Sequence, residues 1–210
     1  MGRFPTVDFT ALADALGIDL TAAFSDLAAV YTDVDARNQK NTRDLDLPCR
    51  RGCSDCCHES VFLTPLEFLY VWRYVQETLS EDERDAIIDE ALALYAAHQK
   101  PIDGFLEPPP EGEGDHFAIA RGLRFTCPFL DGEGACRVYP ARELYARLFG
   151  ASFNKQGGIY GCALVGESLG GRTVTLLAAE PQARRLAELP LTHMRQVYPW
   201  FFTWLFTDDE

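Results

Sequence analysis

The stretch Cys49-Arg50-Arg51-Gly52-Cys53-Ser54-Asp55-Cys56-Cys57 places four thiols within nine residues, in a C-x3-C-x2-C-C pattern. Such short spacings let one turn of backbone present several thiolates to the same metal centre. A single buried cysteine often serves only as a small apolar side chain, but packing does not account for thiols this concentrated. We therefore predict that Cys49, Cys53, Cys56 and Cys57 are metal ligands in a loop or broken helix start.

The two adjacent cysteines of this stretch have diverging side chains, because successive residues point in different directions. Cys56 and Cys57 therefore do not easily reach one mononuclear centre together. Three roles stay open for one member of the pair: it binds a second metal, it supports the site without ligating, or it remains a free thiol.

A second pair of cysteines lies further along the chain. Cys127 and Cys136 flank Asp131-Gly132 and Gly134, which permit the chain to reverse its direction. We predict that this knuckle brings both thiols together and shares one metal centre with the first cluster. Both ends of the intervening segment would then be tied to one centre, so metal loss should loosen the whole fold. The last cysteine, Cys162, is either a further ligand or a packed free thiol.

The number of cysteines also bears on the compartment. Seven is odd, and their clustering argues against a framework of structural disulfides. The first residues contain no continuous apolar segment of the kind that an export signal needs. These features predict a cytoplasmic protein, because clustered thiols in reducing surroundings usually hold metal. Redox sensing by disulfide exchange is the alternative, favoured if Arg50 and Arg51 lower a thiol pKa.

Composition indicates a globular protein. With 210 residues and 47% hydrophobic content, the chain is expected to form one domain over residues 1–210. A net charge of −13 disfavours binding to nucleic acid and to anionic membranes. No apolar run reaches the roughly 18 residues of a membrane-spanning helix. The expected partner is a protein or small molecule of unknown identity, and the sequence leaves the oligomeric state open.

Helical signals predict a mainly α fold, a compact helical domain with a small irregular or β section around the cysteine-ligated metal site. Apolar residues at helical spacing indicate a helix starting around Leu20, and they are Phe24, Leu27, Tyr31 and Val34. Capping boxes at Thr64–Glu67 and Ser80–Glu83 begin two further helices, running to about Thr78 and to about His98. We expect these two helices to pack as an antiparallel pair.

Other segments give weaker signals. Residues 101–115 are rich in proline, glycine and acidic side chains, which predicts a surface excursion. A short helix is expected within residues 142–149, and further helical structure from residue 182 to the aromatic stretch at 198–206. That stretch is interpreted as core in preference to a partner-binding surface.

The region after Cys162 contains a formal match to a hydrolase motif. Residues 166–170 fit the nucleophile-elbow pattern, but that motif needs a strand before it and a helix after it. Because residues 173–178 favour a strand, we interpret 166–170 as a hairpin loop. The predicted organisation is an N-terminal helical segment (1–47), a cysteine-cluster metal-binding region (48–165), and a short strand with a C-terminal helix (166–210).

With both cysteine groups in view, the sequence resembles the YkgJ-like cysteine-cluster family over roughly Pro48–Val165. The likeness rests on the first cluster, on Cys127-Pro128-Phe129-Leu130 and on Cys136-Arg137-Val138-Tyr139. Members typically continue with R-P-x-x-C-R-x-F, and the corresponding stretch here is Arg142-Glu143-Leu144-Tyr145-Ala146-Arg147-Leu148-Phe149. The resemblance implies chelation of zinc or iron through a CxxCxxCC-type motif.

The sequence departs from this family pattern in three places. The first spacing is one residue longer, Glu143 replaces the family's proline, and Ala146 replaces its cysteine. Either one coordination position stays open, or Tyr145 or Glu143 supplies an oxygen. Cys162 resembles a downstream cysteine of some members and is the alternative that would complete the set.

Three other side chains are candidates near the site. His58 follows the first cluster, and we favour an edge position over an imidazole ligand for it. Arg142 and Arg147 match family positions, where they could hold cluster charge or an acidic substrate group, or pair with carboxylates.

Thiolate ligation suits both zinc and iron–sulfur chemistry. An iron–sulfur cluster of the 4Fe–4S type is favoured by the number of cysteines, the adjacent thiols and a similarity to cluster-bearing flagellin lysine methylases. The predicted role is redox, sensing or modification. The alternatives are a zinc-stabilised interaction module without catalysis and a cluster-dependent protein methyltransferase-like enzyme, for which the sequence shows no cofactor motif.

Overall fold

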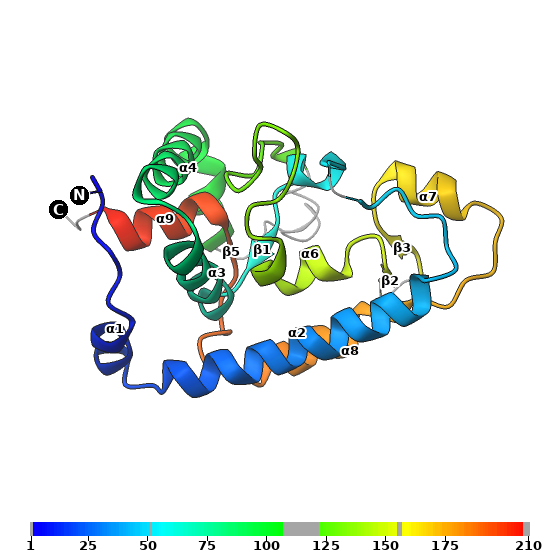
Figure 1. Ribbon diagram of the computed structural model, residues 1–210, viewed down its shortest axis with the longest axis horizontal. Coiled ribbons are helices and arrows are strands. Elements are labelled where there is room, and N and C mark those ends of the chain that lie inside the picture. Colours follow the sequence, from blue (N-terminus) through cyan, green and yellow to red (C-terminus); the bar gives the residue numbers. More distant parts are fainter. Residues whose placement is uncertain (1, 51, 107–121, 155–156, 208–210) are drawn as a thin grey trace.

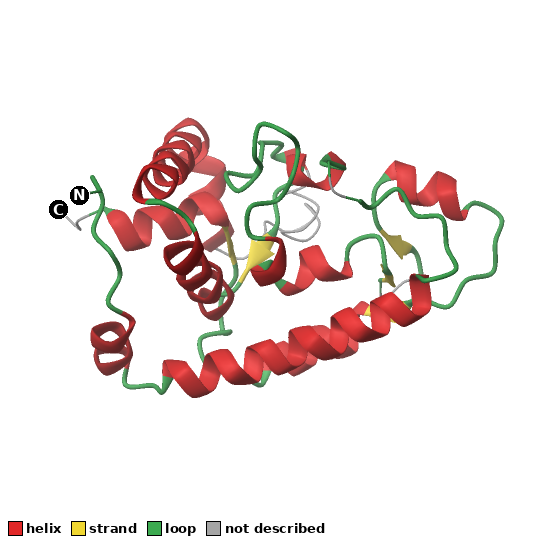
Figure 2. Ribbon diagram, viewed as in Figure 1, coloured by secondary structure: helices red, strands yellow, loops and turns green. Residues whose placement is uncertain are grey.

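Helices make up most of the protein and its strands are short, as the computed structural model shows for residues 2–50, 52–106, 122–154 and 157–207 (Figure 2). The helices are α1 (Phe9–Leu16), α2 (Leu20–Thr42), α3 (Pro65–Thr78), α4 (Glu81–Asp103), α6 (Leu144–Leu148), α7 (Ala163–Leu169), α8 (Ala179–Ala187) and α9 (Tyr198–Phe206). The 3₁₀ turns are η1 (Asp55–His58), η2 (Gly104–Leu106) and η3 (Tyr139–Ala141). The strands are β1 (Phe62–Leu63), β2 (Ser152–Phe153), β3 (Ile159–Tyr160), β4 (Leu177–Ala178) and β5 (Gln196–Val197). The predicted mainly α fold is confirmed.

Helix α2 runs along one side of the molecule and joins its two ends, with α8 beside it (Figure 1). Asp19 caps its start by accepting a hydrogen bond from the Ala22 N–H, so the predicted start near Leu20 is confirmed. The helix continues through its polar second half because Asn38 turns inward and its Nδ2 donates to the Arg147 carbonyl at 2.9 Å. In the described parts of the chain, no helix is both long and apolar enough to cross a membrane.

Two capping boxes begin α3 and α4 as predicted. In each, the first hydroxyl accepts from a backbone N–H three residues on, and the carboxylate there accepts from the first N–H. The pairs are Thr64 with Glu67 and Ser80 with Glu83. Helix α4 continues beyond the predicted end, through a non-helical backbone at His98. It contacts mainly α9 rather than α3, so the expected antiparallel pair is not the packing unit.

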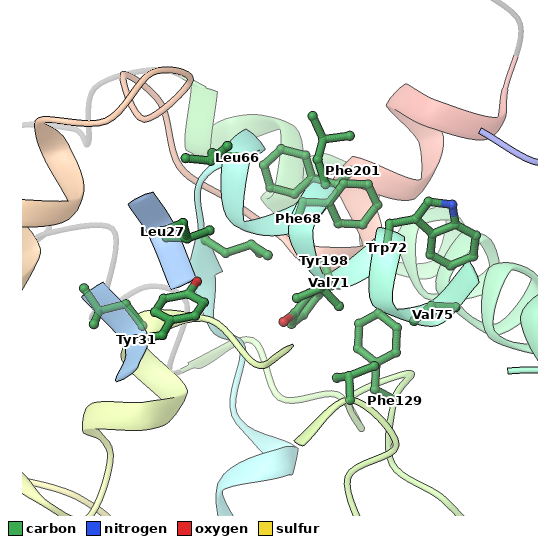
Figure 3. Packing of buried hydrophobic residues seen from close by; sticks show 14 of the residues in the cluster. Leu27, Tyr31, Leu66, Phe68, Val71, Trp72, Val75, Phe129, Tyr198 and Phe201 are labelled. Atoms are coloured by element: carbon green, nitrogen blue, oxygen red, sulfur yellow. The ribbon is translucent and has the colours of Figure 1, made fainter. Parts of the chain in front are cut away.

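The core is aromatic where α3 meets α9 (Figure 3). Phe68 stacks on Phe201 with ring centroids 5.0 Å apart, and Trp72 meets Phe202 edge-on at 5.5 Å. Phe201 and Phe202 are fully buried, which confirms the aromatic stretch as core, whereas Trp200 and Phe206 are partly buried and Trp204 is 41% exposed. This core lies at the end of the molecule where both chain termini are found (Figure 1).

The predicted surface excursion at 101–115 is wrong for its first part. Residues 101–106 complete α4 and form η2, because Ile102 and Phe105 are buried. Phe105 meets Phe62 of β1 with ring centroids 4.9 Å apart. Residues 107–115 lie outside the described residues.

The interpretation of residues 166–178 also needs correction. Residues 166–169 belong to α7 and not to a hairpin loop, and the predicted strand at 173–178 shrinks to β4. Val165 and Leu169 are four residues apart and both are buried with Leu176, so a helical face outweighs the local glycine signal. Strand β4 pairs in parallel with β2, which pairs antiparallel with β3, while β1 pairs antiparallel with β5.

Candidate metal centre

The proximal cluster comprises residues 49–57, and its described part, residues 49–50 and 52–57, is irregular up to η1, as predicted. Gly52 has a φ of 86°, which favours glycine, and the Cys53 N–H donates to the Arg50 carbonyl at 2.9 Å. The chain then enters η1, where the Cys57 N–H donates to the Ser54 carbonyl at 2.8 Å. Two successive turns thus present the four thiols.

The knuckle, residues 127–136, reverses the chain as predicted. Leu130 and Cys136 form an antiparallel bridge, and the Asp131 N–H donates to the Ala135 carbonyl at 2.9 Å. Asp131 Oδ1 accepts from the N–H groups of Glu133 and Ala135, which holds the turn closed. Cys127 and Cys136 therefore stand at the two ends of one short hairpin.

The proximal cluster and the knuckle are in direct backbone contact. The Cys127 N–H donates to the Cys57 carbonyl at 2.7 Å. On the other side of the turn, a Cβ at Gly134 would lie 3.3 Å from the Gly52 carbonyl oxygen, so two glycines allow the loops to approach. The predicted meeting of these distant segments is confirmed at the level of the backbone.

A third segment, which runs from β2 through β3 to the start of α7, also lies beside the proximal cluster. Gly150 has a φ of 81°, and a Cβ there would lie 3.0 Å from the Cys49 sulfur. Its N–H donates to the Tyr160 carbonyl at 2.7 Å, which places Gly161 and Cys162 nearby. Cys162 immediately precedes α7. The small β section of the fold thus adjoins the cysteines.

All seven cysteines line one cavity of about 1780 Å³. They are free thiols, and they are Cys49, Cys53, Cys56, Cys57, Cys127, Cys136 and Cys162. Ala146, at the position of the missing family cysteine, lines it too. Among the described residues, no three cysteine, histidine or carboxylate side chains are already arranged to hold one metal ion. The structure brings the predicted ligands into one cavity, and their metal ligation stays a prediction.

A comparison with protein families matches residues 48–162 to the CxxCxxCC family, described as "Putative zinc- or iron-chelating domain". The chain belongs to this family. The match lies within the span, roughly Pro48–Val165, over which the sequence resembles this family. No curated protein and no solved structure matches the chain.

The thiols of this CxxCxxCC domain differ in acidity. The sulfur of Cys49 faces Gly150, and burial raises the pKa of this thiol to about 11; burial does the same for the pKa of Cys136. The pKa of Cys56 instead falls to about 7, because the Cys57 side chain hydrogen-bonds to its sulfur. Cys56 is therefore the thiol with the strongest thiolate character at neutral pH, the form that binds metal.

Buried oxygens close the inner wall of the cavity. Glu143 is 3% exposed and accepts a hydrogen bond from the Tyr198 hydroxyl, and burial raises the pKa of this carboxyl. Tyr145, the other oxygen that the sequence offered, accepts from Arg195. Both Glu143 and Tyr145 line the cavity, and a role as oxygen ligand stays a prediction for each.

The two arginines of the family pattern have different surroundings. Arg147 is buried and ion-pairs with Asp35, so pairing with a carboxylate is its role here. Arg142 lines the cavity, lies over the Tyr139 ring at 4.1 Å and has a buried Nε without a hydrogen-bond partner. Its positive charge lowers the thiol pKa of Cys56. Arg142 therefore remains available to an anionic group.

His58 lies at the edge of the CxxCxxCC cluster, as preferred from the sequence. It is exposed, does not line the cavity, and its Nδ1 is 3.2 Å from the Thr126 hydroxyl. Its position next to Cys57 in the sequence does not bring it to the thiols.

Sequence reasoning missed the buried carboxylate that supports the site. Glu67 is fully buried and accepts hydrogen bonds from the Tyr31 hydroxyl on α2 and the Leu144 N–H at the start of α6. It also closes the capping box of α3, so one carboxylate joins three helices. The capping box was visible in the sequence, but nothing there showed that its glutamate is buried.

Proposed function

We propose that this chain holds an iron–sulfur cluster of the 4Fe–4S type among its cysteines and uses it in a redox, sensing or modification role. The observation that carries the proposal is the presence of seven free thiols around one cavity. A structural zinc site is complete with four ligands and a 4Fe–4S cluster is held by four cysteine thiolates, so the seven thiols are more than enough for either group. Iron–sulfur clusters are held by cysteine thiolates that distant segments often supply.

The residues present fit such a group. The donors are soft thiolates, and Gly150 leaves the space beside the Cys49 sulfur that a Cβ would fill. When bound, a cluster supplies one-electron chemistry, and Arg142 offers a positive charge against the negative thiolates.

Isolation without oxygen tests the proposal. The protein should be brown and contain iron and acid-labile sulfide in equal amounts. Cys127→Ser should lower both, whereas Ser54→Ala, a change within the proximal cluster that removes no thiol, should leave both unchanged. A colourless protein with stoichiometric zinc and no sulfide would reject the cluster.

The knuckle favours a second candidate, a zinc-stabilised interaction module. Two cysteines at the ends of a glycine-containing turn are an arrangement that suits tetrahedral zinc. In that case chelation should unfold the protein, and no reversible reduction potential should be found.

A further inference from the structure

Arg142 carries a positive charge without a counter-charge on the wall of the cavity. Its side chain is partly buried, and its Nε is shielded from solvent and has no hydrogen-bond partner in the described chain. None of the ion pairs between described residues includes Arg142. Burial of a cation without a counter-charge is costly, so this arrangement favours an anionic partner from outside the chain.

Arg147 lies on the same wall, and each of its three guanidinium nitrogens has an acceptor. Its Nε donates to the Arg142 carbonyl at 2.7 Å, its Nη2 donates to the Pro140 carbonyl at 2.6 Å, and its Nη1 pairs with Asp35. Glu143 follows Arg142 in the sequence, but its carboxyl accepts a hydrogen bond from the Tyr198 hydroxyl instead. The missing partner is therefore particular to Arg142.

One face of the Arg142 guanidinium is covered by an aromatic ring. Its central carbon lies 4.1 Å from the centroid of the Tyr139 ring. Tyr139 lines the cavity and is also 59% exposed, so the pair lies where the cavity opens to solvent. With a ring on one face, an anion approaches along the N–H edge of the guanidinium. In that plane arginine binds a planar carboxylate through two parallel hydrogen bonds.

We infer that the mouth of this cavity binds a small organic monocarboxylate, with the Arg142 guanidinium as its anchor. A single negative charge matches a single guanidinium, and the net charge of −13 disfavours a dianion. Ala146 brings only a methyl group to the same cavity of about 1780 Å³, which leaves room for the organic part of the ligand. The inference goes beyond the proposed function and does not require a bound metal.

Calorimetric titration with propionate tests the inference. The full chain is isolated without oxygen, with the metal that it carries, and is titrated at constant ionic strength. We expect saturable binding of propionate, which Arg142→Gln should weaken about tenfold or more through the loss of charge-assisted hydrogen bonds. Arg137→Gln is the matched control and should leave the affinity unchanged. Arg137 lines the same cavity, but its charge acts on the carboxyl groups of Glu83 and Glu90 on α4.

Absence of propionate binding would overturn the inference, and so would equal affinity in Arg142→Gln and the unmodified chain. Tighter binding of sulfate than of propionate would also overturn it, because the site would then prefer a dianion. If Arg142→Gln fails to fold by circular dichroism, Arg142→Lys decides, since it keeps the charge but loses the planar fork and should still weaken propionate binding.

Metal and acid-labile sulfide are measured on the same samples, which separates this inference from the proposed function. If propionate does not bind and Arg142→Gln lowers the metal content, Arg142 serves the metal centre and only the carboxylate site is rejected. A chain that binds propionate through Arg142 but contains zinc and no sulfide would keep the carboxylate site and reject the cluster.

Discussion

At the scale of single residues, the unequal acidity of the adjacent thiols gives a direct prediction. In the reduced, metal-free protein, Cys56 should react with iodoacetamide with a midpoint near pH 7, because its pKa is about 7 and the thiolate is the nucleophile. Cys49, with a pKa of about 11, should react only at much higher pH. Peptide mass spectrometry across a pH series measures both profiles.

The variant Cys57→Ala provides the control for this prediction. It removes the hydrogen bond that lowers the Cys56 pKa, so the Cys56 midpoint should move up towards about 8.5, the value of an unperturbed thiol. Identical profiles for Cys56 and Cys49 in the unmodified protein would contradict the assignment.

Glu143 gives a second prediction, about pH. Burial raises its folded pKa above the unfolded value of about 4.3, so the carboxyl stabilises the fold most when protonated. That contribution is complete below about pH 4.3 and is lost as pH rises through the raised folded pKa. Compared with Glu143→Gln, the unmodified protein should therefore lose stability as pH rises. Urea unfolding of the metal-free, reduced protein between pH 4 and 8 measures the difference.

Glu83 is the matched control, because its shift has the opposite sign. Hydrogen bonds from Ser80 lower the pKa of this exposed carboxyl, so its contribution is present above about pH 4.3 and is lost as pH falls. The loss of stability caused by Glu83→Gln should therefore be smallest at low pH. If the difference in unfolding free energy between the unmodified protein and Glu143→Gln does not change with pH, the Glu143 carboxyl keeps one protonation state over this range, which would contradict the prediction.

At the scale of elements, a comparison of alanine variants at Gly150 and Gly157 distinguishes the cost of backbone strain from the effect of a contact with a candidate ligand. Gly150 and Gly157 have φ values of 81° and 79°, so alanine should cost roughly 1 kcal/mol or more at either position through the backbone. Only at Gly150 would the added Cβ meet the Cys49 sulfur, at 3.0 Å, whereas nothing lies within 4 Å at Gly157. Gly150→Ala should therefore lower metal content, and Gly157→Ala should not. Melting temperature and metal analysis of both variants check this, and equal metal loss would refute the contact.

The helices also show which features of the fold can be predicted from local sequence and which cannot. The starts of α3 and α4 were predictable, because a capping box is a local interaction between residues three apart. Helix α7 was not, because the burial of Val165 and Leu169 beside Leu176 is a tertiary effect that the surrounding glycines conceal. The expected pairing of α3 with α4 failed for the same reason, since α9 arrives from far along the chain to cover α4.

At the scale of the whole molecule, the contact between the proximal cluster and the knuckle was predictable from the sequence. The buried carboxylates that lie beside this contact were not. Clustered thiols and turn glycines are visible in the sequence, so the contact of Cys57 with Cys127 could be expected. The sequence indicates Glu67 as a capping residue and Glu143 as a possible oxygen ligand, but nothing in it shows that these two of the 32 acidic residues are buried. Only the packing of helices from distant segments buries them and turns them into hydrogen-bond acceptors.

The arrangement of the molecule also predicts where metal loss acts. The aromatic core of α3 and α9 lies at the end that carries the termini, while the cysteine loops lie towards the other end, with α2 alongside both (Figure 1). Phe68 and Phe201 are fully buried and stack on each other, whereas Cys127 and Cys136 pack against this core and are only partly buried. In contrast to the expectation from the sequence that metal loss loosens the whole fold, this core should therefore stay folded when metal is removed. After chelation, backbone amides of residues 48–63 and 122–138 should exchange hydrogen much faster, while those of α3 and α9 keep their protection. Hydrogen exchange with mass spectrometry measures both regions, and a uniform loss of protection would instead show that the metal holds the entire fold together.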